Sequence, residues 1–352
     1  MRDIPQLKKK PGTALVLGGG ALKGFYYHLG VLKALEEAGE DITAIVGTSA
    51  GAVIGAFAAG GISATTLMGS IGARKLYVPE RDIWVESLSM TTLFKPLYHS
   101  YLRQYFAFLQ ESAKFIASLP WMLGKDLINE ALDKLIGNQT EIIGLFDPAA
   151  LERLMDALLP TQDFAENKID LYVTASFLDN PHLRSVFNGN YHFEDVENRF
   201  TTGVPISRAV RASSAIPGVF EPVKIDDQYY VDGEIKQTLS ADIGIRLADR
   251  VIISHSYQPI HLAGPRSVRD MGWLNIFKQG VYTIFHERIA TWRYIYEQQN
   301  PGKEIIWIEP DPTDVEFFLA PEFSFRPEAQ KLLIEKGMEA AQKALSAAAV
   351  HA

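Results

Sequence analysis

The first 60 residues alternate between short apolar runs and helical spacing, and this alternation constrains the fold more than any other feature. Residues 13–17 form an apolar run that closes at Gly18-Gly19-Gly20, and helical spacing of apolar residues follows as far as Ala38. Residues 42–46 repeat the pattern and end at Gly47-Thr48-Ser49-Ala50-Gly51, ahead of a second helical run. Strands connected through helices in this order predict a parallel sheet with right-handed crossovers. We therefore expect an α/β fold.

The rest of the chain predicts additions to this sheet within a single domain over residues 1–352. Residues 76–160 show no strand alternation and are rich in aromatic side chains, which predicts an inserted helical cap. Residues 265–352 predict a mainly helical C-terminal extension. Returning strands are expected at residues 170–177, 228–231, 251–254 and 304–308, with a last helix at 327–348.

Composition and charge exclude several functional classes. The chain has 34 Lys and Arg against 42 Asp and Glu, a net charge of −8, which is the wrong sign for binding nucleic-acid phosphates. It has no cysteine, so a disulfide scaffold, a thiol nucleophile and cysteine-ligated metal sites are excluded. The N-terminus shows no apolar signal region, and glycines interrupt the long uncharged stretch at residues 42–73. We expect a cytoplasmic protein that is soluble or lies on a membrane surface without crossing it.

The strongest chemical signal is Gly47-Thr48-Ser49-Ala50-Gly51 between a buried strand and a helix. A Gly-x-Ser-x-Gly turn in this context forms a nucleophile elbow, which presents the serine hydroxyl at the edge of the sheet above a helix N-terminus. The alternative is a turn of small residues that simply packs under the helix. The pattern alone leaves both interpretations open.

The glycine loop at Gly18, Gly19 and Gly20 could supply what an acyl-transfer site needs, namely backbone N–H groups that bind an oxyanion. Two nucleotide-binding alternatives fail on spacing. The dinucleotide fingerprint requires a glycine where Lys23 stands, and the Gly-Lys-Ser/Thr of a phosphate loop is absent.

Two residues are candidates for the base that activates the serine. His255 directly follows the strand expected at residues 251–254. Asp232 ends a short strand in Tyr229-Tyr230-Val231-Asp232-Gly233, where open parallel sheets place site residues. The residues alone do not decide between the two.

Four landmarks in order resemble the patatin-like phospholipase family. They are Gly18-Gly19-Gly20 with Lys23-Gly24, the Gly47 to Gly51 turn, the segment from Ala212 to Pro222, and Val231-Asp232-Gly233. The resemblance implies a three-layer α/β/α sandwich with a Ser-Asp dyad, in which Ser49 is the nucleophile and Asp232 the base. It also implies an oxyanion hole built by the glycine loop, and neither a metal nor another cofactor.

The function implied by this resemblance is hydrolysis of fatty acyl esters in lipids or phospholipids, with transient contact to a membrane surface. Two alternatives stay open: an acyltransferase that uses the same dyad, and an inactive hydrolase fold that binds membranes. The aromatic segment at residues 77–121 fits either a lid that dips into lipid headgroups or a stripe packed on the core.

Two departures from the family pattern stand out. Ala21 and Leu22 both precede Lys23 where the family usually has one residue, so the choice of oxyanion amides is open. Glu234 follows Asp232-Gly233 where the family usually has glycine or alanine. We expect Glu234 to be a solvated turn residue.

Overall fold

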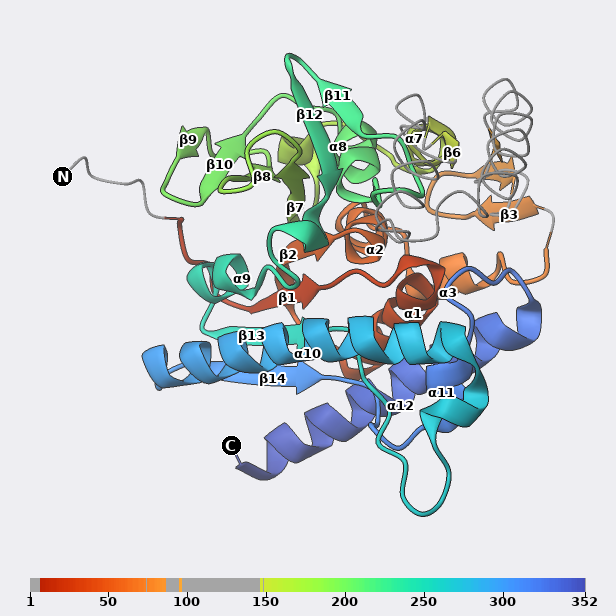
Figure 1. Ribbon diagram of the computed structural model, residues 1–352. Coiled ribbons are helices and arrows are strands. Elements are labelled where there is room, and N and C mark those ends of the chain that lie inside the picture. Colours follow the sequence, from red (N-terminus) through yellow and green to blue (C-terminus); the bar gives the residue numbers. More distant parts are fainter. Residues whose placement is uncertain (1–6, 74, 87–94, 97–145, 148, 352) are drawn as a thin grey trace, which may run out of the picture.

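A mostly parallel sheet forms the centre of the computed structural model, which describes residues 7–73, 75–86, 95–96, 146–147 and 149–351 (Figure 1). Its strands lie in the order β14-β13-β1-β2-β7-β8-β10-β9, and the β11-β12 hairpin joins at β7. The strand bounds are β1 Thr13–Leu17, β2 Ile42–Thr48, β7 Asp170–Phe177, β8 Arg184–Phe187, β9 Phe193–Glu194, β10 Asn198–Thr201, β11 Val223–Ile225, β12 Gln228–Asp232, β13 Arg250–Ser254 and β14 Glu304–Ile308. Parallel pairing runs from β14 to β7, which confirms the predicted α/β sheet.

Helices cover both faces of this sheet, as the predicted three-layer sandwich requires. Their bounds are α1 Ala21–Ala38, α2 Ala50–Ala59, α3 Ala64–Met68, α7 Ala149–Leu158, α8 Ile206–Ser213, α9 Ala241–Leu247, α10 Trp273–Gln299, α11 Val315–Leu319 and α12 Pro327–His351, with 3₁₀ turns η2 Phe164–Glu166, η3 Gly233–Ile235 and η4 Val268–Met271. Alternate residues of each strand face opposite layers. Leu15 and Leu17 belong to the core under α1, α2 and α12, whereas Ala14 and Val16 belong to the core under α9 and α10. Figure 1 shows α10 lying across β13 and β14.

The C-terminal region expected at residues 265–352 contributes both a strand of the central sheet and helices that cover it. It is mainly helical, but β14 is the edge strand of the central sheet beside β13. Helix α12 packs along α1 at a crossing that only glycine permits. A Cβ on Gly30 would lie 2.0 Å from the carbonyl oxygen of Ile334, and one on Gly337 2.0 Å from that of Tyr27.

The region expected to form a helical cap, residues 76–160, departs from that expectation at its described ends. Strands β3 Lys75–Val78 and β4 Ile83–Glu86 form an antiparallel hairpin, and β5 Lys95–Pro96 pairs with β6 Phe146–Asp147. The four-residue strands were too short to give a recognisable alternation. Helix α7 is the helix described in this region, and residues 87–94 and 97–145 lie outside the described residues. Across the parts of the chain that the structure describes, no helix is both long and apolar enough to cross a bilayer.

Candidate active site

Ser49 occupies the tight turn between β2 and α2. Its φ of 53° lies in the left-handed region, which a residue with a side chain adopts rarely and at an energetic cost. A Cβ on Gly51 would lie 2.2 Å from the carbonyl oxygen of Leu17, and one on Gly47 would lie 2.6 Å from the backbone of α2. The amide of Ser49 donates to the hydroxyl of Ser213 at 2.8 Å. The turn therefore has the geometry of a nucleophile elbow, with Ser49 at the N-terminal end of α2.

Strand β7 brings the ends of β2 and β12 together. Parallel β2 ends with Thr48 opposite Thr174, and antiparallel β12 ends with Asp232 opposite Ala175. The two strands therefore meet head to head, because their last residues face neighbouring positions of β7. A Cβ on Gly233 would lie 2.5 Å from the carbonyl oxygen of Thr174, so only glycine lets the chain leave β12 at this point.

Asp232 is buried and hydrogen-bonded to the candidate nucleophile. Only 3% of Asp232 is exposed. Burial raises the pKa of the Asp232 carboxyl to about 6, although hydrogen bonds from the Ser49 side chain and the Glu234 amide oppose this shift. The amide of Glu234 donates to Oδ1 of Asp232 at 3.0 Å. A carboxylate with a pKa of about 6 is a much better base at neutral pH than an ordinary aspartate.

His255, the other candidate base, lies in a different environment. Its ring is fully buried, and Nε2 lies 3.4 Å from Oε2 of Glu309. Its ring centroid lies 6.3 Å from that of His286. Among the described residues, the structure records no contact between His255 and Ser49. The geometry therefore favours Asp232 as the partner of the serine.

The three amides of the glycine loop do not share one environment, which differs from the expected oxyanion hole. The amide of Gly18 donates to the carbonyl oxygen of Ser254 at 3.0 Å and so continues the pairing of β1 with β13. The amide of Gly19 donates to Oε1 of Glu234 at 2.6 Å. Within the described part of the chain, the amide of Gly20 has no recorded acceptor. Of the three, only the Gly20 amide is left without an acceptor among the described residues.

Glu234 is the clearest correction to the sequence-based expectation. We expected a solvated turn residue, yet Glu234 is only 4% exposed. The chain turns inward at η3, because Asp232 accepts the amide of Glu234 and directs the next residues back toward the glycine loop. Sequence reasoning noticed the carboxylate but had no signal for the direction of its side chain.

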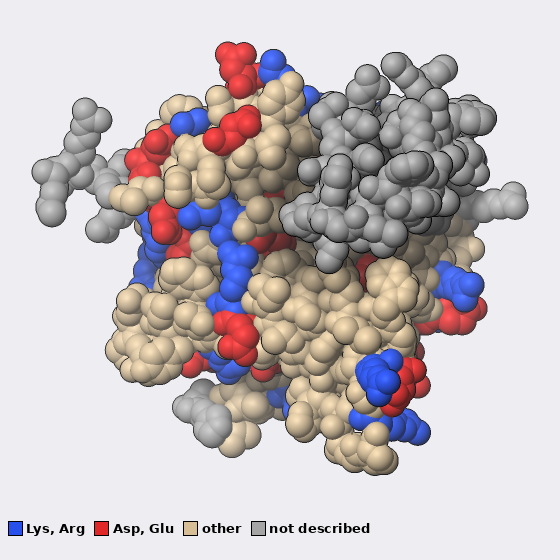
Figure 2. All heavy atoms as spheres, in the orientation of Figure 1, with Lys and Arg blue, Asp and Glu red and all other residues tan. Residues whose placement is uncertain are grey.

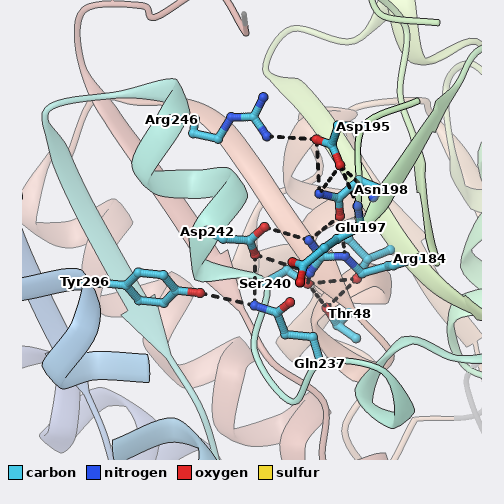
Figure 3. A network of polar contacts seen from close by, with 11 residues as sticks. Thr48, Arg184, Asp195, Glu197, Asn198, Gln237, Ser240, Asp242, Arg246 and Tyr296 are labelled. Carbon is cyan, nitrogen blue, oxygen red and sulfur yellow. Dashed lines mark hydrogen bonds and ion pairs between the residues drawn. The ribbon is translucent and has the colours of Figure 1, made fainter. Parts of the chain in front are cut away.

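A buried polar network supports the elbow from behind (Figure 3). The hydroxyl of Thr48 lies 2.7 Å from that of Thr174 and 3.2 Å from that of Ser240. Arg184, which is 1% exposed, donates to Ser240 at 3.1 Å and to Asp242 at 2.7 Å. The network thus joins the residue before Ser49 to β8 and α9. Sequence reasoning missed it, because single Thr, Ser and Arg residues give no motif.

A metal centre is not formed by the described residues, since no three His, Cys, Asp or Glu side chains gather at a distance that could hold an ion.

Serine hydrolases have a site of this type, in which a serine on a strained strand-to-helix turn is hydrogen-bonded to a base. Residues 15–245 match the family model described as patatin-like phospholipase. This match spans more than half of the sequence, and the chain belongs to the patatin-like phospholipase family.

Comparison with individual proteins gives partial matches. The chain is 28% identical over 280 residues to an uncharacterized NTE family protein of Mycobacterium tuberculosis, covering 78% of this chain and 58% of that protein. It is 42% identical over 79 residues to lysophospholipase nte1 of Emericella nidulans, covering 22% of this chain and 5% of that protein. Among solved structures, VipD from Legionella pneumophila aligns over 96% of this chain and 68% of that chain, with 16% identity and a TM-score of 0.40. The chain thus spans little more than half the length of its mycobacterial relative.

Proposed function

We propose that this protein is a lipid acyl hydrolase of the serine esterase type, with Ser49 as nucleophile and Asp232 as base. The observation that carries the proposal is the hydrogen bond between Ser49, strained at the elbow, and the buried Asp232 carboxyl. Membership of the patatin-like phospholipase family supports lipid hydrolysis in general. The roles of Ser49 and Asp232 go beyond what family membership supports and are the part that the experiment below tests.

The geometry supports a two-step reaction. Ser49 Oγ attacks the ester carbonyl while its proton passes to Asp232, and the carbonyl electrons move onto the oxygen as an oxyanion. When the oxyanion collapses, the bond to the alcohol breaks and Asp232 returns the proton to the leaving oxygen. Water then attacks the acyl-serine and loses a proton to Asp232, which forms a second oxyanion. When this oxyanion collapses, the bond to Ser49 Oγ breaks, Asp232 gives its proton to Oγ, and the fatty acid leaves. If an alcohol replaces water in the second step, the same dyad acts as an acyltransferase.

A lipid substrate is supported by an exposed apolar face at the start of α10. Trp273 is 73% exposed, Leu274 62% and Phe277 66%. Figure 2 shows that the surface over α10 consists largely of uncharged residues. Aromatic and aliphatic side chains in such a position suit transient contact with a lipid surface. Vesicles of phosphatidylcholine should retain the wild type more strongly than a Trp273→Ser, Phe277→Ser double variant, and equal retention would refute this contact.

One observation favours a second candidate function. Because the amides of Gly18 and Gly19 already have acceptors, the site offers fewer free oxyanion donors than expected. A catalytically inactive protein that binds membranes fits this arrangement.

Hydrolysis of p-nitrophenyl octanoate separates the two functions. The proposal predicts turnover that disappears in Ser49→Ala and falls strongly in Asp232→Asn, with folding checked by circular dichroism. Turnover that survives in Ser49→Ala would refute the assignment. Vesicle binding without turnover would favour the inactive protein.

A further inference from the structure

The Glu234 side chain lies inside the proposed active site, in contact with the glycine loop. Its Oε1 accepts the Gly19 amide at 2.6 Å. The contact is tight, because a Cβ on Gly19 would lie 2.9 Å from Cγ of Glu234 and 2.8 Å from the hydroxyl of Tyr257. Glu234 therefore already accepts the hydrogen bond of one of the amides that the sequence assigns to the oxyanion hole.

The second carboxyl oxygen of Glu234 has no partner. Oε2 is buried and lacks a hydrogen bond to any described residue. Leaving a buried polar group unpaired typically costs about 1–3 kcal/mol, so each such group calls for an explanation, of which a catalytic role is one. The unpaired carboxyl oxygen lies beside the amide of Gly19, so we infer that a bound substrate supplies its hydrogen-bond partner.

The charges around Glu234 favour its protonated form. Burial, followed by the negative charge of Asp232, raises the pKa of Glu234 well above its ordinary value, and the Gly19 amide and the more distant Arg288 oppose the shift. Arg288 donates to the carbonyl oxygen of Lys236 rather than to Glu234. Tyr257, the other titratable group here, has its pKa raised well above its ordinary value by burial, so it stays neutral. Burial and the nearby negative charge of Asp232 therefore both favour a neutral Glu234 carboxyl.

We propose that the protonated carboxyl of Glu234 is a donor of the oxyanion hole, which accepts the Gly19 amide on Oε1 and gives Oε2–H to the substrate's oxyanion. In this arrangement the carboxyl takes over the role of the Gly19 amide, and Gly20 N–H supplies a second donor. A carboxylic acid kept neutral by burial acts as an oxyanion donor in other enzymes. The inference rests on the proposed acyl-transfer function, because only that reaction forms an oxyanion here.

A different role would leave the same contact with Gly19. If the Glu234 carboxylate merely blocked the Gly19 amide, its removal would free that amide and raise activity. The donor role predicts the opposite, because removal takes away a hydrogen bond made in the transition state.

Two variants of nearly equal size separate these roles. Glu234→Gln keeps both hydrogen-bonding roles of a neutral acid. Its carbonyl oxygen accepts from the Gly19 amide, and its NH₂ group can donate to the oxyanion. Glu234→Met fills the same space without any donor. The measurement is kcat and KM for p-nitrophenyl octanoate from pH 5 to 10, with Ser49→Ala as the blank and thermal melting as the check on folding.

The donor role predicts that Glu234→Met loses about 10²–10³-fold in kcat with little change in KM, whereas Glu234→Gln stays within about fivefold of wild type. Wild-type activity should also decline at high pH as Glu234 loses its proton, and Glu234→Gln should not show this decline. Glu234→Met as active as wild type or more active, or Glu234→Gln as impaired as Glu234→Met, would overturn the inference. If Glu234→Met fails to fold, the pH profile of Glu234→Gln decides alone. A wild type without Ser49-dependent turnover would instead refute the proposed function.

Discussion

Replacing Asp232 by asparagine should slow catalysis strongly and yet stabilise the protein at neutral and alkaline pH. The carboxyl of Asp232 has a pKa of about 6 in the folded protein against an ordinary value of 3.8, and burial is the main cause. Because the folded state binds this proton more tightly, the carboxyl contributes stability at low pH that is lost as the pH rises through about 6. A difference of about 2 pKa units corresponds to about 3 kcal/mol. Asparagine keeps a carbonyl for the Ser49 and Glu234 donors but never acquires the buried charge.

The assay is urea unfolding of wild type and Asp232→Asn at pH 5 and pH 8, with Ser49→Ala as the control that leaves the carboxyl in place. At pH 8 we expect Asp232→Asn to have a free energy of unfolding higher by about 3 kcal/mol. Integrating the same two pKa values, this advantage should shrink by about 1 kcal/mol at pH 5, where most of the wild type already carries the proton. A variant no more stable than wild type at pH 8 would refute the buried base with a raised pKa on which the account depends.

Three further predictions concern the elbow and the base. Gly51→Ala should destabilise the protein by about 3 kcal/mol and abolish Ser49 reactivity, because the added Cβ would clash with a β1 carbonyl oxygen. The control Gly280→Ala, in α10 with open space around it, should stabilise the protein by about 1 kcal/mol. Equal melting temperatures for the two variants would contradict the packing argument. Thr48→Val should lower the free energy of unfolding by about 1 kcal/mol and slow Ser49 labelling, because the elbow loses its hydroxyl contacts, and the exposed Thr65→Val is the matched control. Ester hydrolysis should rise as the pH passes through about 6, where Asp232 loses its proton, and a flat profile between pH 5 and 7 would argue against this base.

The sheet and the elbow were predictable because both rest on local patterns. Apolar runs that close at glycine clusters predicted β1 at its observed bounds, and predicted β2 from its observed start to two residues before its observed end. The glycines around Ser49 predicted the tight turn, since a Cβ at Gly47 or Gly51 has no space. These features depend on residues that are neighbours in the sequence, so the sequence alone was enough to predict them.

The features that sequence reasoning missed depend on contacts between distant segments. Glu234 and Gly19 are 215 positions apart, and nothing in Asp232-Gly233-Glu234 says that the side chain turns inward. Arg184 reaches the elbow through Ser240, 56 positions away. The residues alone left Asp232 and His255 open, and the family resemblance named Asp232. The register of β12 on β7 then places Asp232 beside the end of β2. Contacts between distant segments, rather than local secondary-structure propensity, determine the surroundings of these side chains.

The central claim is that Ser49 is a nucleophile activated by Asp232, and labelling with a fluorophosphonate tests it most directly. A serine reacts readily with this probe only when it is both activated and accessible. Intact mass and peptide mapping of wild type, Ser49→Ala and Asp232→Asn would locate the adduct. The account predicts one adduct on Ser49, absent from Ser49→Ala and formed at least about 100-fold more slowly in Asp232→Asn. No adduct under conditions that label a control lipase, or equal labelling of Asp232→Asn, would contradict it.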